Sequence, residues 1–281
     1  GKKSILWGTG YAWNPAGFLN RPKDPDDPAL NLEGRTLLGV DLITAYDDWV
    51  EHVHREAEDV QRRVARSGFP DSRALTADGE SKGQPVFTAD GCGLILAIGN
   101  GEEDPGLFRL PVDGAGPRER LCLSGSQTRV TQDRSGRLFY ARTAPHRNIY
   151  YYNDVFVLDR PGAEPRRLTD GLRARSVGIS PRGDRLALVV NDAGTTRLVL
   201  SDEEGNPIRS LLEPDRFDQV HEPTWSPDGR SVAVVVRRAH QFDLELIDVG
   251  TGEIRKITDD RAMESSPAFD RSGRFLLFES D

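Results

Sequence analysis

The pentapeptide Trp225-Ser226-Pro227-Asp228-Gly229 decides the fold of this chain. Related turns stand at residues 87–91, 132–136, 179–183 and 269–273, and the five final glycines are 45, 47, 46 and 44 residues apart. In such a turn proline fixes φ at the first corner, a Ser or Asp side chain bonds to the backbone, and glycine takes the position with positive φ. One hairpin therefore recurs at a fixed period, which is typical of a repeat architecture.

Each turn is followed by a short apolar run of strand-like composition, such as residues 186–190 or 232–236. A polar turn, a third strand-like run and a fourth run follow. The fourth run ends in a shared phrase, Arg-Arg-Leu-Thr-Asp at 166–170 and Arg-Lys-Ile-Thr-Asp at 255–259. Four short strands in each repeat is the composition of a propeller blade. The sequence therefore predicts an all-β fold, a β-propeller of four-stranded antiparallel blades over residues 72–281.

The apolar residue four positions before each turn glycine is expected to pack between neighbouring blades. Trp225 holds this position in the fourth turn, whereas Gln132 breaks the pattern in the second. The second blade is therefore expected to pack less well than the others.

These turns and phrases resemble the WD-like repeats of TolB-type propellers, which have aromatic-Ser-Pro-Asp-Gly at the first hairpin and Arg-Arg-Leu-Thr at the outer edge of the blade. Residues 225–230 match fully, and the other four copies match in part. The resemblance implies six blades in the full chain, of which about four and a half are visible. The last repeat stops after two strands, so either the chain is cut there or residues 4–7 supply a third strand. Residues 72–76 are expected to add the fourth strand that closes the ring.

The residues before the repeats divide into an irregular, proline-rich segment at 1–40 and a helix at 41–68. Seven apolar residues of the helix recur at steps of three or four, which predicts an amphipathic helix. Because an isolated helix is marginal in water, Trp49 and Val53 are expected to be buried against the propeller or a neighbouring domain. The same order of helix and propeller is similar to bacterial envelope peptidases with a zinc-binding HExxH domain upstream, which implies that the helix is the tail of such a domain.

Composition and motifs narrow the classes of function. The 281 residues carry a net charge of −8, which argues against nucleic acid as a partner. No apolar run reaches the roughly 18 residues of a membrane span. The sequence has no HExxH, no GxSxG elbow, no dinucleotide fingerprint and no metal-ligand spacing, so we expect no catalytic residue, no metal and no cofactor in this chain. Cys92 and Cys122 form either one disulfide or two separate buried thiols, and the second is favoured.

Candidate binding residues open the innermost strand of each repeat. His221 and Glu222 lie three to four residues before Trp225, and the equivalent positions in other repeats include Gln84, Arg129 and Arg175. In a propeller these positions surround one mouth of the central channel. Two arginines against one glutamate favour an anionic group such as a peptide carboxylate. The alternative is that these residues only solvate the channel mouth. The predicted ligand-binding residues are Gln84, Arg129, Arg175, His221 and Glu222.

Two functions remain open from the sequence. The leading hypothesis is a non-catalytic propeller module that binds a protein or peptide in a bacterial envelope protein. The periplasmic or extracellular location is implied by the resemblance alone. The alternative is an accessory propeller domain that gates or positions the substrate of a peptidase, of the zinc HExxH type upstream or the prolyl-oligopeptidase-like serine type downstream. The flanking reading frame distinguishes these, because each peptidase type has its own motif.

Overall fold

The structure is a computed structural model that describes residues 42–67, 74–76, 81–101, 104–114, 116–125 and 128–280. The chain divides into two compact units, Gly1–Arg73 and Ala74–Asp281. The predicted irregular segment 1–40, with the strand-like run 4–7, lies outside the described residues.

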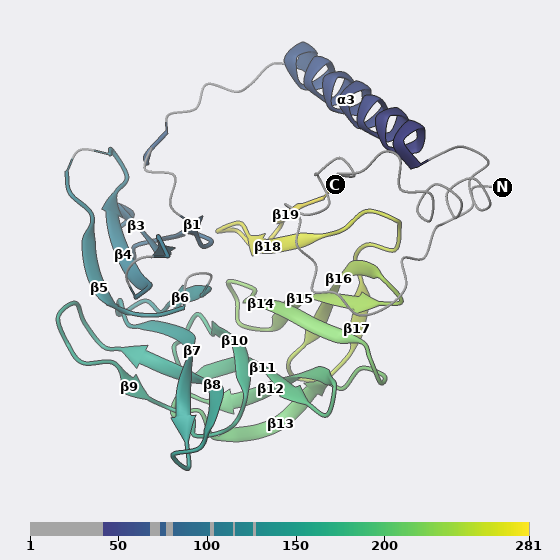
Figure 1. Cartoon of the computed structure of the whole chain (residues 1–281). Helices are drawn as coiled ribbons and strands as arrows, with labels where there is room; N and C mark the ends of the chain where they lie inside the picture. The colour runs from purple at the N-terminus through teal and green to yellow at the C-terminus, as the bar shows by residue number, and fades with distance from the viewer. Residues whose placement is uncertain are drawn as a thin grey trace. The chain divides into compact units, whose positions relative to one another are not determined.

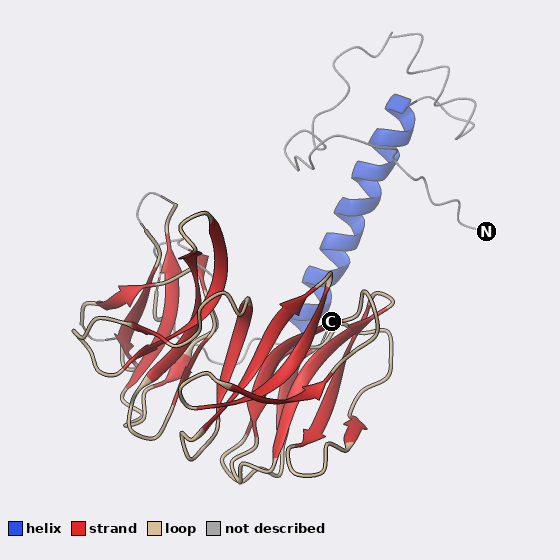
Figure 2. Cartoon of the chain, turned by 90° about the horizontal axis from the view of Figure 1, so that it is seen from below, coloured by secondary structure: helices blue, strands red, loops and turns tan. Residues whose placement is uncertain are grey.

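The described part of the first unit is one helix, α3 (Leu42–Ser67), which confirms the helix predicted from periodicity (Figure 2). An ion pair joins Glu51 to Arg55 at 2.8 Å, and His52 Nε2 lies 3.4 Å from a Glu56 carboxylate oxygen, both at the four-residue spacing that supports a helix. The exposed fractions of Trp49 and Val53 are 38% and 40%, and their burial against the propeller or a neighbouring domain stays a prediction. A single helix cannot enclose its own apolar stripe, so these side chains keep contact with solvent.

The second unit is built of antiparallel sheets that follow one another around a common axis (Figure 1). The first blade comprises β1 (Ser81–Lys82), β2 (Val86–Phe87), β3 (Gly93–Gly99), β4 (Gly106–Pro111) and β5 (Glu119–Leu123). The second comprises β6 (Val130–Gln132), β7 (Leu138–His146), β8 (Tyr150–Leu158) and β9 (Arg166–Arg167). Because β1 and β2 both pair with β3, they are two pieces of one inner strand.

The remaining sheets repeat this order. The third blade comprises β10 (Ala174–Ile179), β11 (Arg185–Asp192), β12 (Thr195–Asp202) and β13 (Pro207–Leu212). The fourth comprises β14 (Gln219–Trp225), β15 (Ser231–Arg238), β16 (Gln241–Asp248) and β17 (Ile254–Lys256). A fifth sheet has two described strands, β18 (Ser265–Phe269) and β19 (Leu276–Glu279). The described residues thus confirm a propeller of four-stranded antiparallel blades, with four blades followed by two strands of a fifth.

The repeated turns are equivalent hairpins, as their sequence predicts. All five final glycines have positive φ, and the backbone N–H of each donates to the carbonyl three residues earlier at 2.8–3.1 Å. The φ values are 72° for Gly91, 92° for Gly136, 76° for Gly183, 73° for Gly229 and 70° for Gly273. Glycine is needed here because other residues reach this region only with strain.

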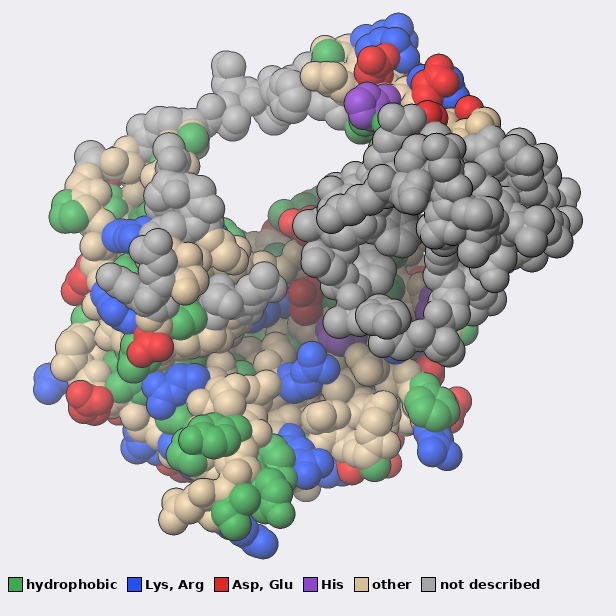
Figure 3. Space-filling model, in the orientation of Figure 1, with side chains coloured by type: hydrophobic (Ala, Val, Ile, Leu, Met, Phe, Trp, Pro, Cys, Tyr) green, Lys and Arg blue, Asp and Glu red, His purple; other side chains and the backbone are tan. Residues whose placement is uncertain are grey.

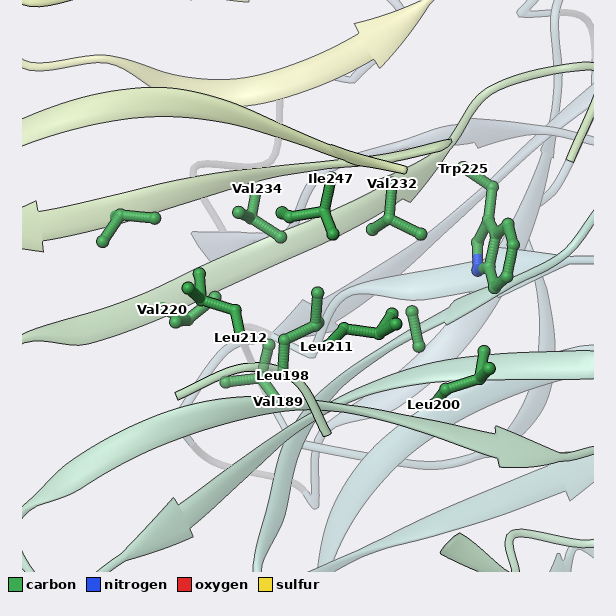
Figure 4. Packing of buried hydrophobic residues seen from close by; sticks show 12 residues of the cluster. Val189, Leu198, Leu200, Leu211, Leu212, Val220, Trp225, Val232, Val234 and Ile247 are labelled. Atoms are coloured by element: carbon green, nitrogen blue, oxygen red, sulfur yellow. The ribbon is translucent and has the colours of Figure 1, made fainter. Parts of the chain in front are cut away.

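Trp225 packs between the third and fourth blades (Figure 4). Its exposed fraction is 8%, its neighbours in the cluster include Leu200 and Val232, and its Nε1–H donates to the Gly178 carbonyl at 3.0 Å. The inner strands approach closely here, because a Cβ on Gly178 would lie 2.7 Å from the Pro223 carbonyl oxygen. The predicted role of Trp225 as an anchor between blades is confirmed.

The same position in the second blade is packed differently. Gln132 donates from Nε2 to the Gly136 carbonyl at 3.2 Å, within its own turn. It lines a cavity of about 270 Å³ together with Ile95, Leu121 and Leu138. Looser packing of this blade stays a prediction, because Trp225 also lines a cavity, of about 510 Å³.

Two further predictions need correction. Residues 74–76, the described part of 72–76, are not in a strand. A fourth strand needs a third to pair with, and β18 and β19 are the described strands of the fifth sheet.

Cys92 and Cys122 are separate thiols, as favoured, but Cys92 is exposed and Cys122 half-buried. Cys92 directly follows Gly91 in the first turn, where its N–H donates to the Asp90 carboxylate at 2.9 Å.

Candidate functional site

The inner strands of the first four blades surround a cavity of about 740 Å³. All five predicted site residues line it. Gln84 lies between β1 and β2, Arg129 lies directly before β6, Arg175 lies in β10, and His221 and Glu222 lie in β14. Figure 3 shows charged side chains of both signs in the central hollow of the propeller. The structure therefore brings together residues that are up to 138 positions apart in sequence.

Irregular pairing of the inner strands positions these side chains. The register shifts between Ala174 and Ser176 and between His221 and Thr224, so the strands bulge where they line the channel. Glu222 adopts a φ of 52°, in the left-handed region. A bulge re-aims the side chains around it, and such backbone geometry persists only when the surrounding contacts hold it.

The cavity is rich in positive charge. Its lining includes Lys82, Arg129, Arg142 and Arg175, against Glu222 as the one acidic residue of the described lining. This excess contrasts with the net charge of −8 over the chain. A concave site lined by one sign of charge concentrates ligands of the opposite sign.

The sequence did not point to Lys82 and Arg142. Arg142 lies inside β7, away from the repeated inner-strand position, and its guanidinium lies 4.3 Å from the centre of the Phe156 ring. Lys82 lies in β1, two residues before Gln84. Lys82 could have been found by including the residues next to the repeated inner-strand positions. The sequence offers no such signal for Arg142, because its place in the lining depends on the path of β7 through the blade.

Arg129 contacts two other parts of the propeller. Its Nη2 donates to the Pro267 carbonyl at 3.2 Å, and its Nη1 lies 3.7 Å from Glu222 Oε2. Burial lowers the pKa of Arg129, and the charge of Glu222 opposes that shift. The same Oε2 accepts the Ser266 N–H at 2.6 Å. Arg129 and Glu222 thus link the second and fourth blades to β18.

His221 lies in a mixed environment. Burial lowers the pKa of its imidazole below the ordinary 6.5, and the positive charge of Arg175 lowers it further. The carboxylate of Glu222 raises the pKa, and Arg237 lowers it. The imidazole is therefore neutral at pH 7.

A second cavity, of about 510 Å³, adjoins the first along the channel. Both cavities are lined by Gln84 and Arg129, and the second also by Ser266. A hydrogen bond from Gln84 Nε2 to Ser266 Oγ joins the first blade to β18. We call Gln84, Arg129, Glu222 and Ser266 the waist, because they connect to one another where the two cavities meet.

The described residues include no group of three or more His, Cys, Asp or Glu side chains that could hold a metal ion. No described helix is long and apolar enough to cross a membrane. The cavity is lined by guanidinium, ammonium, hydroxyl, amide and imidazole groups, which bind anionic oxygen atoms, and by the carboxylate of Glu222.

Comparison with known proteins identifies relatives of the propeller. Residues 165–265 match the family described as "Lipoprotein LpqB beta-propeller domain". A stretch of 130 residues is 25% identical to "Uncharacterized peptidase YuxL" of Bacillus subtilis (strain 168), covering 45% of this chain and 18% of that protein. The chain thus spans less than a fifth of the length of that curated relative.

Solved structures share the fold. Putative TolB from Agrobacterium tumefaciens matches with a TM-score of 0.62 at 21% identity, over 74% of this chain and 73% of that one. A prolyl endopeptidase structure matches with a TM-score of 0.50 at 14% identity, over 75% of this chain and 33% of that one. In its blades and hairpins the chain shares the β-propeller fold of these TolB and prolyl endopeptidase structures.

Proposed function

We propose that this propeller is a non-catalytic binding module of a bacterial envelope protein, and that its larger cavity holds an anionic group of a protein or peptide partner. The observation that carries the proposal is the lining of that cavity, with four cationic side chains and one carboxylate in an acidic chain. Its volume of about 740 Å³ falls within the usual range of ligand sites. The envelope location is supported by the match to the propeller domain of a lipoprotein.

Arginine suits this role because its planar guanidinium donates two parallel hydrogen bonds to a carboxylate. Arg175 is exposed and Arg142 is half-buried, so a ligand can reach both from the cavity. Neither side chain belongs to the waist, so both can be removed without breaking the links to β18.

The test is binding of fluorescent tetraglutamate, measured by anisotropy, with tetralysine as the oppositely charged control. The wild-type chain is expected to bind tetraglutamate and to ignore tetralysine. Arg142→Ala with Arg175→Ala should weaken binding by about tenfold or more, since one charge-assisted contact is worth about 1.5 kcal/mol or more. Arg255→Ala, on the exposed strand β17, should bind like wild type. Equal binding by all three proteins would place the site elsewhere.

A second candidate function is an accessory propeller domain of a peptidase. The similarity to an uncharacterized peptidase from Bacillus subtilis favours it. In that case the same cavity would select or position acidic substrates for a separate catalytic domain. The flanking reading frame tests this, because HExxH before residue 1 or GxSxG after residue 281 would identify the zinc or the serine type.

A further inference from the structure

Three buried polar atoms in the lining of the larger cavity have no hydrogen-bond partner within the described part of the chain. They are Arg129 Nη1, Ser176 Oγ and His221 Nε2. They come from three successive blades, the second, third and fourth. Folded proteins seldom leave such atoms unpaired, because each loses its bonds to water on burial. Three of them in one lining therefore indicate a place that accepts the oxygen atoms of a ligand.

The chemistry of these atoms selects the ligand. A guanidinium can only donate hydrogen bonds, a serine hydroxyl can donate, and Nε2 of a neutral imidazole donates in one of its tautomers. A carboxylate can only accept, with two oxygen atoms that together offer about four positions for donors. Each of the three groups can therefore donate to a carboxylate oxygen, which none of them could do to a cationic group.

Glu222 competes for this position. Its Oε2 lies 3.7 Å from Arg129 Nη1, which is beyond hydrogen-bond distance, but accepts the Ser266 N–H at 2.6 Å. The carboxylate of Glu222 is therefore held by Ser266 and only loosely paired with Arg129. A ligand carboxylate can bond to Arg129 directly and would be repelled by the charge of Glu222.

The cationic groups of the site lie at two levels. Arg175 is exposed and lines only the larger cavity, whereas the Arg129 side chain is 21% exposed and lines both. An anionic group that contacts Arg175 is therefore nearer the solvent than one that contacts Arg129.

We infer that Arg129, Ser176 and His221, which all line the larger cavity, form an inner carboxylate site, for which Glu222 is the internal competitor. The ligand is an acidic extended segment that places one carboxylate at Arg175 and another at Arg129. This inference rests on the proposed function, because it names the class of ligand and the residue that limits its affinity.

The experiment uses tetraglutamate with the whole chain and three single variants. Glu222→Gln removes the competing charge and keeps an oxygen that can accept the Ser266 N–H, so it should bind about fivefold more tightly or better. Ser176→Ala removes one hydroxyl and should bind about threefold to tenfold more weakly. Arg129→Met keeps much of the buried aliphatic volume and should bind at least about tenfold more weakly.

The outcomes separate the two proposals. If wild type does not bind tetraglutamate, or if Arg142→Ala with Arg175→Ala has no effect, the proposed function is wrong and the inner site with it. If that double variant weakens binding but Glu222→Gln and Ser176→Ala bind like wild type, the inner site is wrong and the function stands. Thermal melts of each variant identify loss of fold. If Arg129→Met unfolds, the result is decided by Ser176→Ala, which removes only one unpaired hydroxyl.

Discussion

Replacing Trp225 tests whether the repeated turn stabilises the propeller by anchoring neighbouring blades. Trp225 is 8% exposed and donates from Nε1 to Gly178 of the preceding blade. Phe87 holds the same position in the first turn, yet it is 64% exposed. The chain thus offers two equivalent turns that differ in whether the anchor is enclosed by a second blade.

The expected magnitudes follow from burial. Truncating a buried aromatic side chain to alanine costs about 3–5 kcal/mol, so Trp225→Ala should destabilise the propeller by that amount. Trp225→Phe keeps most of the apolar contact and loses the N–H donor, which should cost about 1–2 kcal/mol. Phe87→Ala should change stability by less than about 1 kcal/mol, because most of the ring is already in water.

The assay is urea unfolding followed by far-ultraviolet circular dichroism, with the free energy of unfolding taken from the transition midpoint and slope. The order of loss should be Trp225→Ala, then Trp225→Phe, then Phe87→Ala. The reasoning is refuted if Trp225→Ala costs less than about 1 kcal/mol or no more than Phe87→Ala, since burial between blades would then contribute little.

Gln132→Leu should raise the melting temperature by about 2–4 °C, because the apolar side chain fills part of the 270 Å³ cavity it lines; an unchanged or lower value would show that its bond to Gly136 matters more. Burial and Arg175 lower the pKa of His221 in the folded protein, and Glu222 opposes them. The unfolded chain therefore takes up this proton first, and stability should fall as pH drops from about 7 through 6.5 to the lower folded pKa, by at most about 1.4 kcal/mol per pH unit. In His221→Gln, urea unfolding at pH 7.5 and 5.5 should show a smaller difference than in wild type, and an equal difference would contradict the pKa argument.

Local rules were sufficient to predict the blades. The turn chemistry of Gly229 and its four equivalents depends on a few neighbouring residues, and each glycine has the positive φ that the turn requires. The periodic apolar positions of α3 likewise predicted its extent to within one residue at each end. Whether Trp49 is buried depends on which surface covers the helix, and periodicity carries no information about that surface.

For the candidate site too, the sequence predicted the positions of the residues but not their tertiary contacts. The spacing of the repeats predicted that Gln84, Arg129, Arg175, His221 and Glu222 lie where the inner strands begin, and all five line one cavity. The spacing of the repeats does not tell whether a side chain at such a position faces the cavity or forms a bond to another blade across the channel. Arg129 and Glu222 do both, since each lines the larger cavity and also bonds to β18.

This double role changes how the site must be tested. Replacing Arg129 with alanine would remove a ligand contact and also the bond to Pro267, so weaker binding could reflect displacement of β18. Arg175 and Arg142 carry no such bond to β18 among the described contacts, so their loss reports on the ligand alone. Glu222→Gln is the most informative change, because a purely structural role predicts weaker or equal binding, whereas competition for Arg129 predicts tighter binding. A gain in affinity is the one result that loss of structure does not produce.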